Sequence, residues 1–203
     1  MITIVDYGMG NLGSIQNMLK RIGVAAQITG EAAALLRASK ILLPGVGAFD
    51  SAMQRINSSS LRAVLDRKAL EERVPVMGIC LGMQLLTRGS QEGDLPGLGW
   101  IAATTRRFPT IPGLKVPHMG WNLVTPHTPS ALTAGFDSLS EPRFYFVHSY
   151  FIECDDPDSA ILHTTYGVTY ASAIQQGNVY GVQFHPEKSH RFGMKLLENF
   201  AGL

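Results

Sequence analysis

Short apolar runs alternate with segments of helical periodicity along the first half of the chain. Runs with the composition of buried strands occupy residues 2–5, 25–28, 41–43 and 74–79. Between them, apolar residues recur every three or four positions, which predicts helices at residues 12–22, 31–38 and 61–72 and after Asp50. This alternation predicts an α/β fold, with an open, twisted, mostly parallel sheet and helices on both faces.

The pattern changes after about Gly89, where glycine and proline become frequent and short strand-like pieces replace the alternation. These pieces lie at residues 100–104, 122–125, 144–147, 150–153, 170–175 and 179–184. We expect antiparallel hairpins added to the same sheet, because no linker interrupts the chain. Residues 1–203 are therefore expected to form one domain, closed by a last helix at residues 191–200.

Three glycine-containing segments directly follow predicted strands: residues 6–10, residues 44–47 and the surroundings of Cys80. Sites in open α/β sheets form at the carboxyl ends of strands, so these segments are expected to gather at one edge. Asn11 and Asp50 stand where the next helices begin and are expected to cap them.

Composition narrows the class of protein. The chain has 203 residues, of which 45% are hydrophobic and 16% charged, with a net charge of +1. These values exclude a disordered chain and give no electrostatic reason to expect nucleic acid or an anionic membrane as partner. There is no signal-peptide pattern and no apolar run of membrane-spanning length. Two cysteines without a CxxC or Cys/His cluster suggest no metal, and we expect a soluble, cytoplasmic protein.

Cys80 lies in a G-x-C-x-G pattern between a predicted strand and a helical segment, with Gly78 and Gly82 on either side. This is the cysteine version of a nucleophile elbow, a turn too tight for neighbouring Cβ atoms. A thiol there also lies at a helix N-terminus, where backbone dipoles favour a thiolate. The pattern fits a small buried core cysteine equally well.

The stretch GVQFHPEKS supplies a possible base. His185 follows a strand-like run, and Glu187 lies two residues on, which in extended backbone puts both side chains on one side. A cysteine nucleophile needs a base for its proton, and the base needs a carboxylate to orient its ring. A lone His-Pro-Glu is usually a surface turn, but together with the elbow it favours a catalytic triad of Cys80, His185 and Glu187.

Two glycine-rich loops allow more than one interpretation. PGVG, residues 44–47, is either a simple turn or a source of backbone N–H donors for an oxyanion, from Val46 and from Leu81 after the nucleophile. YGMGNLGS, residues 7–14, has the G-x-G-x-x-G spacing of a dinucleotide loop. The only acid near the required offset is Glu31, so we expect no NAD site.

Other polar and aromatic segments are less informative. Gln84 and Glu92 fit an ordinary polar face, and PHMGWN at residues 117–122 fits either a hairpin with a packed tryptophan or a contact surface. FYFVHSY at residues 144–150 predicts an aromatic core strand in which His148 is structural, although a second base is an alternative. Cys154 lacks glycine neighbours and a basic partner, and we expect it to be structural.

The motifs PGVGAF, GICLGMQLL and GVQFHPEKS, in this order and spacing, resemble class I (triad) glutamine amidotransferases. Within that family, IVDYGMGNLGSI, PHMGWN and FYFVHSY resemble the glutaminase subunits of imidazole glycerol phosphate synthase, which serve histidine biosynthesis. The resemblance covers essentially the whole chain. It implies that Cys80 attacks the carboxamide of glutamine, that His185 transfers the proton, and that Glu187 orients His185.

The resemblance also implies further roles. The Gly45–Val46 segment would reorient to complete the oxyanion hole with Leu81. Glutamine would be held by residues at matching family positions, namely Gln84, Glu92, Ser149 and Tyr150. Ammonia would pass to a separate (β/α)₈ cyclase subunit in a heterodimer and yield imidazole glycerol phosphate and an aminoimidazole carboxamide ribotide. The positions that match its interface are Trp121, Tyr145 and Lys188. No cofactor and no metal are implied, and glutaminase activity is expected to stay slow until the cyclase is loaded.

Three alternatives remain at this point. Another triad amidotransferase would feed an anthranilate-type or nucleotide-type synthase, which PHMGWN and the YGMGN start disfavour. A non-catalytic regulatory subunit would not need an intact triad. A cysteine peptidase is disfavoured because nothing resembles a papain-like signature.

Overall fold

A sheet of ten strands forms the centre of the computed structural model, which describes residues 1–203. The main path of the sheet has the order β2-β1-β3-β4-β12-β11-β10-β7, with β5 on β9 and β9 on β11. Its strands are β1 (Ile2–Val5), β2 (Ala26–Thr29), β3 (Ile41–Gly45), β4 (Val76–Cys80), β5 (Ala103–Arg107), β7 (Thr125–Pro126), β9 (Tyr150–Cys154), β10 (Ala160–Tyr166), β11 (Val168–Gln176) and β12 (Val179–Val182).

Parallel pairing of five strands brings the predicted site together. β1 pairs with β2 and β3, β3 pairs with β4, and β4 pairs with β12, all in parallel. The register places Gly45 opposite Cys80 and Val182 opposite Ile79. The segment after β12, which carries His185, therefore emerges at the same sheet edge as the segments after β3 and β4, as the sequence predicted.

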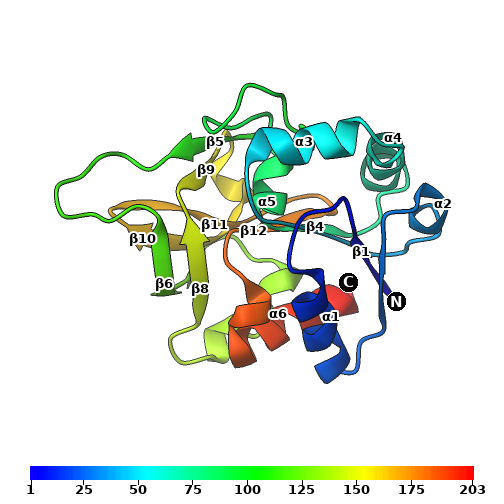
Figure 1. Cartoon of the computed structure of the whole chain (residues 1–203). Helices are drawn as coiled ribbons and strands as arrows, with labels where there is room; N and C mark the ends of the chain where they lie inside the picture. Colours follow the sequence, from blue (N-terminus) through cyan, green and yellow to red (C-terminus); the bar gives the residue numbers. More distant parts are fainter.

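Helices cover both faces of the sheet, as Figure 1 shows, with α1 and α6 on one face and α3, α4 and α5 on the other. The helices are α1 (Leu12–Arg21), α2 (Ala32–Leu35), α3 (Phe49–Asn57), α4 (Leu61–Asp66), α5 (Leu81–Leu85) and α6 (His190–Gly202), and a π-helical turn (Arg67–Glu71) extends α4. Two apolar cores result, one on each face. Each fully buried aliphatic or aromatic side chain contributes about 1.5–3 kcal/mol to folding. The predicted α/β class is confirmed.

The second half of the chain is antiparallel, as expected, but its strands differ from the prediction in four respects. β6 (His118–Leu123) and β8 (Arg143–His148) form a separate two-stranded sheet. β6 begins four residues before the predicted strand at 122–125, because its inward positions His118 and Asn122 are polar. The strand expected at 100–104 lies at Ala103–Arg107, and β10 was not predicted.

The expected helix caps are wrong in detail. Asn11 occupies the N-cap of α1, but its side chain makes no capping hydrogen bond. α3 begins at Phe49, one residue before Asp50, whose carboxylate instead accepts hydrogen bonds from the amides of the loop at residues 94–95. The amide of Phe49 donates to Oε2 of Glu92 at 3.0 Å. A side chain distant in sequence therefore does the capping.

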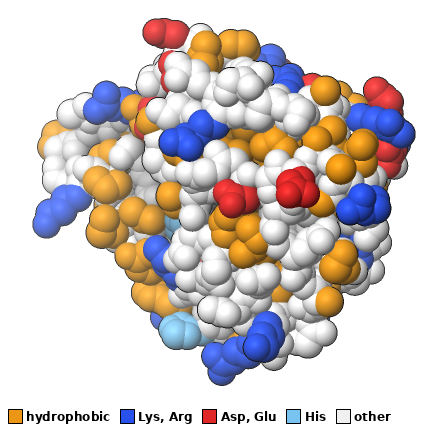
Figure 2. All heavy atoms as spheres, turned by 45° about the vertical axis from the view of Figure 1, so that its right-hand side comes forward, with side chains coloured by type: hydrophobic (Ala, Val, Ile, Leu, Met, Phe, Trp, Pro, Cys, Tyr) orange, Lys and Arg blue, Asp and Glu red, His pale blue; other side chains and the backbone are white.

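Charged side chains of both signs are interspersed over the face shown in Figure 2. This distribution agrees with the net charge of +1. No helix combines the length and apolarity needed to cross a lipid bilayer.

Candidate active site

The turn between β4 and α5 presents Cys80 in a strained backbone conformation. Cys80 has φ of 55° and ψ of −112°, and residues other than glycine rarely adopt a positive φ of this kind. A Cβ at Gly78 would lie 2.5 Å from the carbonyl oxygen of Gly82, and a Cβ at Gly82 would lie 1.8 Å from that of Leu43. Only glycine fits at either position, so the sharp elbow predicted from the sequence is present.

His185 and Glu187 form a buried pair just beyond β12. Nδ1 of His185 lies 2.8 Å from Oε1 of Glu187, and both side chains are almost fully buried. The expected extended backbone is wrong, because His185 caps a 3-10 turn at Pro186–Lys188. The turn still brings the two side chains together. A carboxylate only accepts hydrogen bonds, so Nδ1 donates to Glu187 and Nε2 is left for proton transfer.

The free nitrogen of His185 is directed toward the thiol. Nε2 is buried and makes no hydrogen bond, and besides Glu187 the neighbour that acts on the ring is Cys80. Burial lowers the pKa of His185, but its interactions with Cys80 and Glu187 outweigh burial and raise the pKa to about 9. The ring therefore holds a proton at neutral pH, which it can deliver to a leaving group.

A cavity of about 340 Å³ opens in front of Cys80 and His185. Among the predicted site residues, its lining includes Val46, Cys80, Leu81, Gln84, Glu92, Ser149, Tyr150 and His185. Its other lining residues are Gly47, Pro117, Val147 and His148. Gly45 and Glu187 are not among the lining residues. The structure thus brings residues from six separate segments of the chain around one small cavity.

Two buried glutamines form part of the site, and the sequence pointed to neither from spacing alone. Nε2 of Gln84 donates to Oε1 of Gln183 at 3.1 Å and to the carbonyl of Tyr150 at 3.4 Å. Nε2 of Gln183 in turn lies 3.8 Å from the Cys80 sulfur. Gln183 is fully buried, and a polar residue within the apolar run before His185 was the available signal.

Glu92 adds a partly buried carboxylate to the cavity. Burial raises the pKa of Glu92, the hydrogen bond from the Phe49 amide opposes that rise, and the Asp50 charge adds to it. A carboxylate at this position can attract an ammonium group of a ligand. No group of three or more His, Cys, Asp or Glu side chains is arranged to hold a metal ion.

The segments after β3 and β4 carry the predicted oxyanion donors, Val46 and Leu81 respectively. Leu81 is the first residue of α5, so its amide has no partner within the helix. Val46 is 44% exposed, and its amide makes no backbone hydrogen bond. The segment around Val46 is held in place by Tyr7, whose hydroxyl donates to the Pro44 carbonyl at 2.8 Å. Burial and the Cys80 sulfur raise the pKa of Tyr7, so the hydroxyl keeps its proton.

The glycine-rich loop at residues 7–14 packs on this oxyanion segment. A Cβ at Gly47 would lie 2.8 Å from Cε of Met9, and one at Gly10 would lie 3.7 Å from the backbone of Pro44. The glycine spacing marks this loop in the sequence, but nothing marks Tyr7, because a buried tyrosine has no distinctive spacing.

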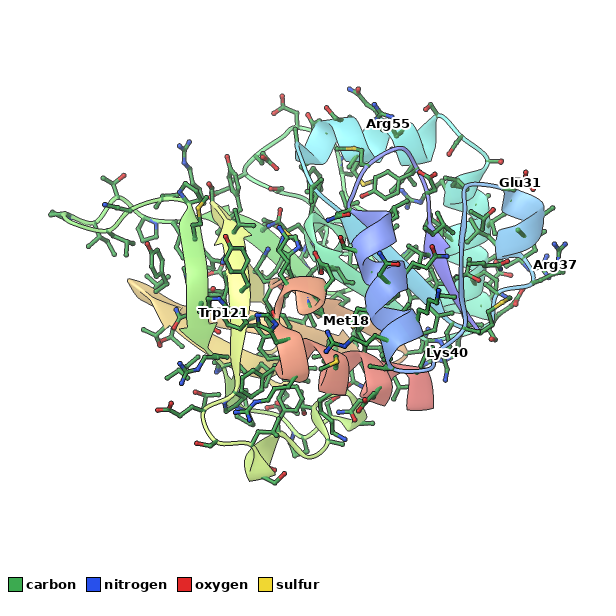
Figure 3. The ribbon with its side chains drawn as sticks, turned by 60° about the horizontal axis from the view of Figure 1, so that its bottom comes forward. Met18, Glu31, Arg37, Lys40, Arg55 and Trp121 are labelled. Carbon is green, nitrogen blue, oxygen red and sulfur yellow. The ribbon has the colours of Figure 1, made fainter.

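The three predicted interface residues form an aromatic cluster on the surface. Trp121 on β6 is 45% exposed and stacks on His190 with ring centroids 5.5 Å apart, and Figure 3 shows it beside the start of α6. Trp121 also meets Tyr145 edge to face at 6.3 Å, and Nζ of Lys188 lies 5.6 Å from the Tyr145 ring. The amide of His185 donates to the Tyr145 carbonyl at 2.9 Å, which joins the cluster to the site.

Cys154 and His148, the other cysteine and the other histidine considered from the sequence, lie outside the triad. Cys154 ends β9 away from the cavity, and burial raises the pKa of its thiol to about 11. His148 is buried and fully hydrogen-bonded, with Nδ1 2.7 Å from the Tyr150 carbonyl. That arrangement agrees with a structural His148 rather than a second base.

Comparison with known proteins gives consistent matches over the full chain. Residues 3–202 match the family model described as glutamine amidotransferase class-I. The chain is 50% identical to a Bdellovibrio bacteriovorus protein named imidazole glycerol phosphate synthase subunit HisH, covering 99% of both chains. It is also 50% identical to imidazole glycerol phosphate synthase subunit HisH 2 of Methanococcus maripaludis, covering 98% of both. A solved structure titled PurLQS from Thermotoga maritima shares the fold, with a TM-score of 0.77, 19% identity and coverage of 99% and 97%.

Proposed function

The chain belongs to the class-I glutamine amidotransferase family, and from this premise we propose that it is the glutaminase subunit of an imidazole glycerol phosphate synthase. Cys80, His185 and Glu187 would form its catalytic triad. The observation that carries this proposal is that the strained Cys80 elbow and His185, which is paired with the buried Glu187, line one cavity.

In the first half of the reaction, the Cys80 sulfur attacks the side-chain amide carbon of glutamine. The C=O electron pair moves onto oxygen, and the amides of Leu81 and Val46 donate to that oxyanion once the Val46 peptide turns inward. Nε2 of His185 protonates the amide nitrogen, the C–N bond breaks, and ammonia leaves behind a glutamyl thioester.

In the second half, water attacks the thioester carbon. His185, now neutral at Nε2, takes a proton from the water, the C–S bond breaks, and glutamate leaves. Glu187 holds Nδ1 at 2.8 Å throughout, which fixes the ring and stabilises its charged form. Each turnover therefore returns Cys80 and His185 to their starting state.

The cavity provides complementary groups for the rest of glutamine. Glu92 can pair with the α-ammonium group, and the Ser149–Tyr150 segment forms the opposite wall. Gln84 fixes that wall through the Tyr150 carbonyl. A volume of about 340 Å³ suits a small polar amino acid.

The ammonia is proposed to pass to a separate (β/α)₈ cyclase subunit in a heterodimer. Support comes from the relatives' names, which describe a synthase subunit, and from the exposed cluster of Trp121, Tyr145 and Lys188. There the ammonia would be incorporated to give imidazole glycerol phosphate and an aminoimidazole carboxamide ribotide. Because Cys80 and Cys154 are both unpaired, we also propose that the complex works in the cytoplasm.

The test is glutamate release by the purified chain alone, with the cyclase subunit, and with the cyclase subunit carrying its ribotide substrate. We expect slow hydrolysis by the isolated chain and faster hydrolysis with the loaded partner. A rate that is the same in all three conditions would contradict the proposed partnership. Glutamate release that survives in the C80A variant would contradict the triad.

A further inference from the structure

A buried group of polar side chains lies between β6 and the candidate glutamine pocket and has no part in the proposed chemistry. His118, His148 and Tyr170 are only 2%, 6% and 3% exposed. His118 belongs to the PHMGWN motif and His148 to FYFVHSY, so both motifs end in this cluster. Polar groups buried this deeply are costly unless every donor and acceptor is paired. Each polar side-chain atom of this group has a hydrogen-bond partner.

The proton on His148 is fixed by a backbone carbonyl. Nδ1 of His148 lies 2.7 Å from the carbonyl oxygen of Tyr150, and a carbonyl only accepts, so Nδ1 carries the proton. Burial is the largest influence on this ring and lowers the pKa of His148 to about 3. The ring is therefore neutral at physiological pH, and its Nε2 is an acceptor.

The proton on His118 is fixed from the other end. Oδ1 of Asn122 accepts from the amide of Leu123 at 2.8 Å, which identifies Nδ2 as the atom 3.2 Å from Nε2 of His118. Nδ2 also donates to the Thr165 carbonyl at 3.0 Å. Burial lowers the pKa of His118 to about 4, so this ring is neutral too. Nε2 accepts from Asn122, and Nδ1 carries the proton.

Tyr170 joins the two rings. Its hydroxyl oxygen lies 3.1 Å from Nδ1 of His118 and 3.0 Å from Nε2 of His148, and these two ring nitrogens are themselves 3.1 Å apart. Nδ1 of His118 has no lone pair to offer, so the hydroxyl proton of Tyr170 goes to Nε2 of His148. The proton on Nδ1 of His118 is shared between the two acceptors beside it, the Tyr170 oxygen and Nε2 of His148. All donors then point one way, from Asn122 through His118, Tyr170 and His148 to the Tyr150 carbonyl. We call these four side chains the histidine chain.

We propose that the histidine chain positions the Ser149–Tyr150 wall of the glutamine pocket, an inference that rests on the proposed function. The Tyr150 carbonyl oxygen accepts two hydrogen bonds, one from Nδ1 of His148 and one, at 3.4 Å, from Nε2 of Gln84. These two bonds use both lone pairs of the oxygen. The neighbouring Ser149 carbonyl accepts from the Phe108 amide at 3.2 Å. The wall is thus held from both sides, and His118, Tyr170 and His148 are positioning residues.

The histidine chain also joins this wall to the strand that carries the surface tryptophan. Residues alternate along β6, so that His118 and Asn122 face inward while Met119, Trp121 and Leu123 are 62%, 45% and 47% exposed. A partner seated on the outer face of β6 therefore contacts the same strand that anchors the chain. The hydrogen bonds of the histidine chain therefore connect the proposed interface to the pocket wall.

Two substitutions at His148 separate positioning from mere packing. His148→Asn keeps a donor near the Nδ1 position and loses the acceptor for Tyr170. His148→Gln keeps an acceptor near the Nε2 position and loses the donor to Tyr150. We expect both variants to unfold at lower urea concentration. H148Q loses the hydrogen bond to the wall itself and should raise KM for glutamine about two- to tenfold, the worth of one hydrogen bond, whereas H148N keeps that bond and should raise KM by a smaller factor. KM values that simply follow the loss of stability in both variants would overturn the proposal.

The proton positions give a second measurement, which does not require glutaminase activity. Two-bond ¹⁵N–¹H spectra of the histidine-labelled protein at pH 7 should show His118 and His148 as neutral rings protonated at Nδ1. Tyr180→Phe is the matched control, because Tyr180 is a buried tyrosine outside the histidine chain, and it should leave both signals and KM unchanged. Protonation of either ring at Nε2 would contradict the hydrogen-bond directions assigned to the histidine chain. If the tautomers are as stated but the protein has no glutaminase activity, the proposed function fails, while the assigned hydrogen bonds of the histidine chain stand.

Discussion

His185 connects the chemistry of the site to pH. Its ordinary pKa of 6.5 is raised to about 9 in the folded protein, against burial and because of Cys80 and Glu187. We therefore expect Cys80→Ala and Glu187→Gln each to lower the pKa of His185, since each removes one of the interactions that favour the charged ring. An NMR pH titration of the imidazole signals measures this directly, and an unchanged pKa in both variants would contradict the assigned contacts.

The same shift predicts how stability depends on pH. A folded-state pKa above the unfolded value means that the protonated ring stabilises the folded state fully below about pH 6.5, and that this contribution is lost as pH rises through about 9. The free energy of unfolding in urea should therefore fall between pH 7 and 9.5, and more steeply in the wild type than in E187Q. Equal slopes in the two proteins would show that His185 does not supply the effect.

Tyr7 is the residue through which the oxyanion segment can be tested separately from the nucleophile. Tyr7→Phe removes the hydroxyl that donates to the Pro44 carbonyl. We expect kcat for glutamine to fall about two- to tenfold, the worth of one hydrogen bond, because the oxyanion donors are held less well. Alkylation of Cys80 by iodoacetamide forms no oxyanion and should keep its rate. A parallel loss in both reactions would mean that Tyr7 acts on the thiol instead.

At the scale of elements, the elbow depends on the close contact of α5 with β3. Gly82→Ala would place a Cβ 1.8 Å from the Leu43 carbonyl, so we expect a loss of about 3–5 kcal/mol in the free energy of unfolding. Gly13→Ala is the matched control, because Gly13 also lies in a helix but has no atom within 4 Å of an added Cβ. That variant should gain about 0.5–1 kcal/mol from helix propensity. Urea unfolding of both variants measures the contrast, and a tolerated G82A would contradict the tight elbow.

The elements that the sequence predicted well are those whose residues share one simple environment. β3 and β4 are buried throughout and appear as apolar runs, and the elbow carries its glycine signature at Gly78 and Gly82. β6 was placed four residues late because its inward face holds the polar histidine chain, so that burial and apolarity do not coincide. Capping of α3 by Glu92 was unpredictable from local sequence, because the partner is 43 residues away.

The residues of the site divide in the same way, into those with a local signal in the sequence and those that depend on distant contacts. Cys80, His185 and Glu187 could be found because a strained turn and a short His-Pro-Glu stretch leave local marks in the sequence. Tyr7 and Gln183 could not, because each acts through a contact that only the folded chain creates, at 2.8 Å from the Pro44 carbonyl and 3.8 Å from the Cys80 sulfur.

At the scale of the whole molecule, the exposed cluster around Trp121 is where a partner would change the behaviour of the site. Trp121→Ala removes the ring that stacks on His190, and buried aromatic anchors often contribute about 2 kcal/mol or more to an interface. We expect cyclase binding to weaken at least tenfold and activation to fall, with KM for glutamine unchanged in the isolated chain. Leu70→Ala is the control, because Leu70 is 53% exposed on a helical turn that carries none of the proposed interface residues. Unchanged affinity in W121A would remove this cluster from the interface.

The most direct test of the central claim, that Cys80 releases ammonia for use by a second subunit, is synthesis by the complex of cyclase with the Cys80→Ala variant. With glutamine as nitrogen source, we predict no formation of imidazole glycerol phosphate. With ammonium salts at raised pH, we predict formation at the rate of the wild-type complex, because the cyclase needs only free ammonia. Synthesis from glutamine by the variant, or failure with both nitrogen sources despite normal complex formation, would contradict the account.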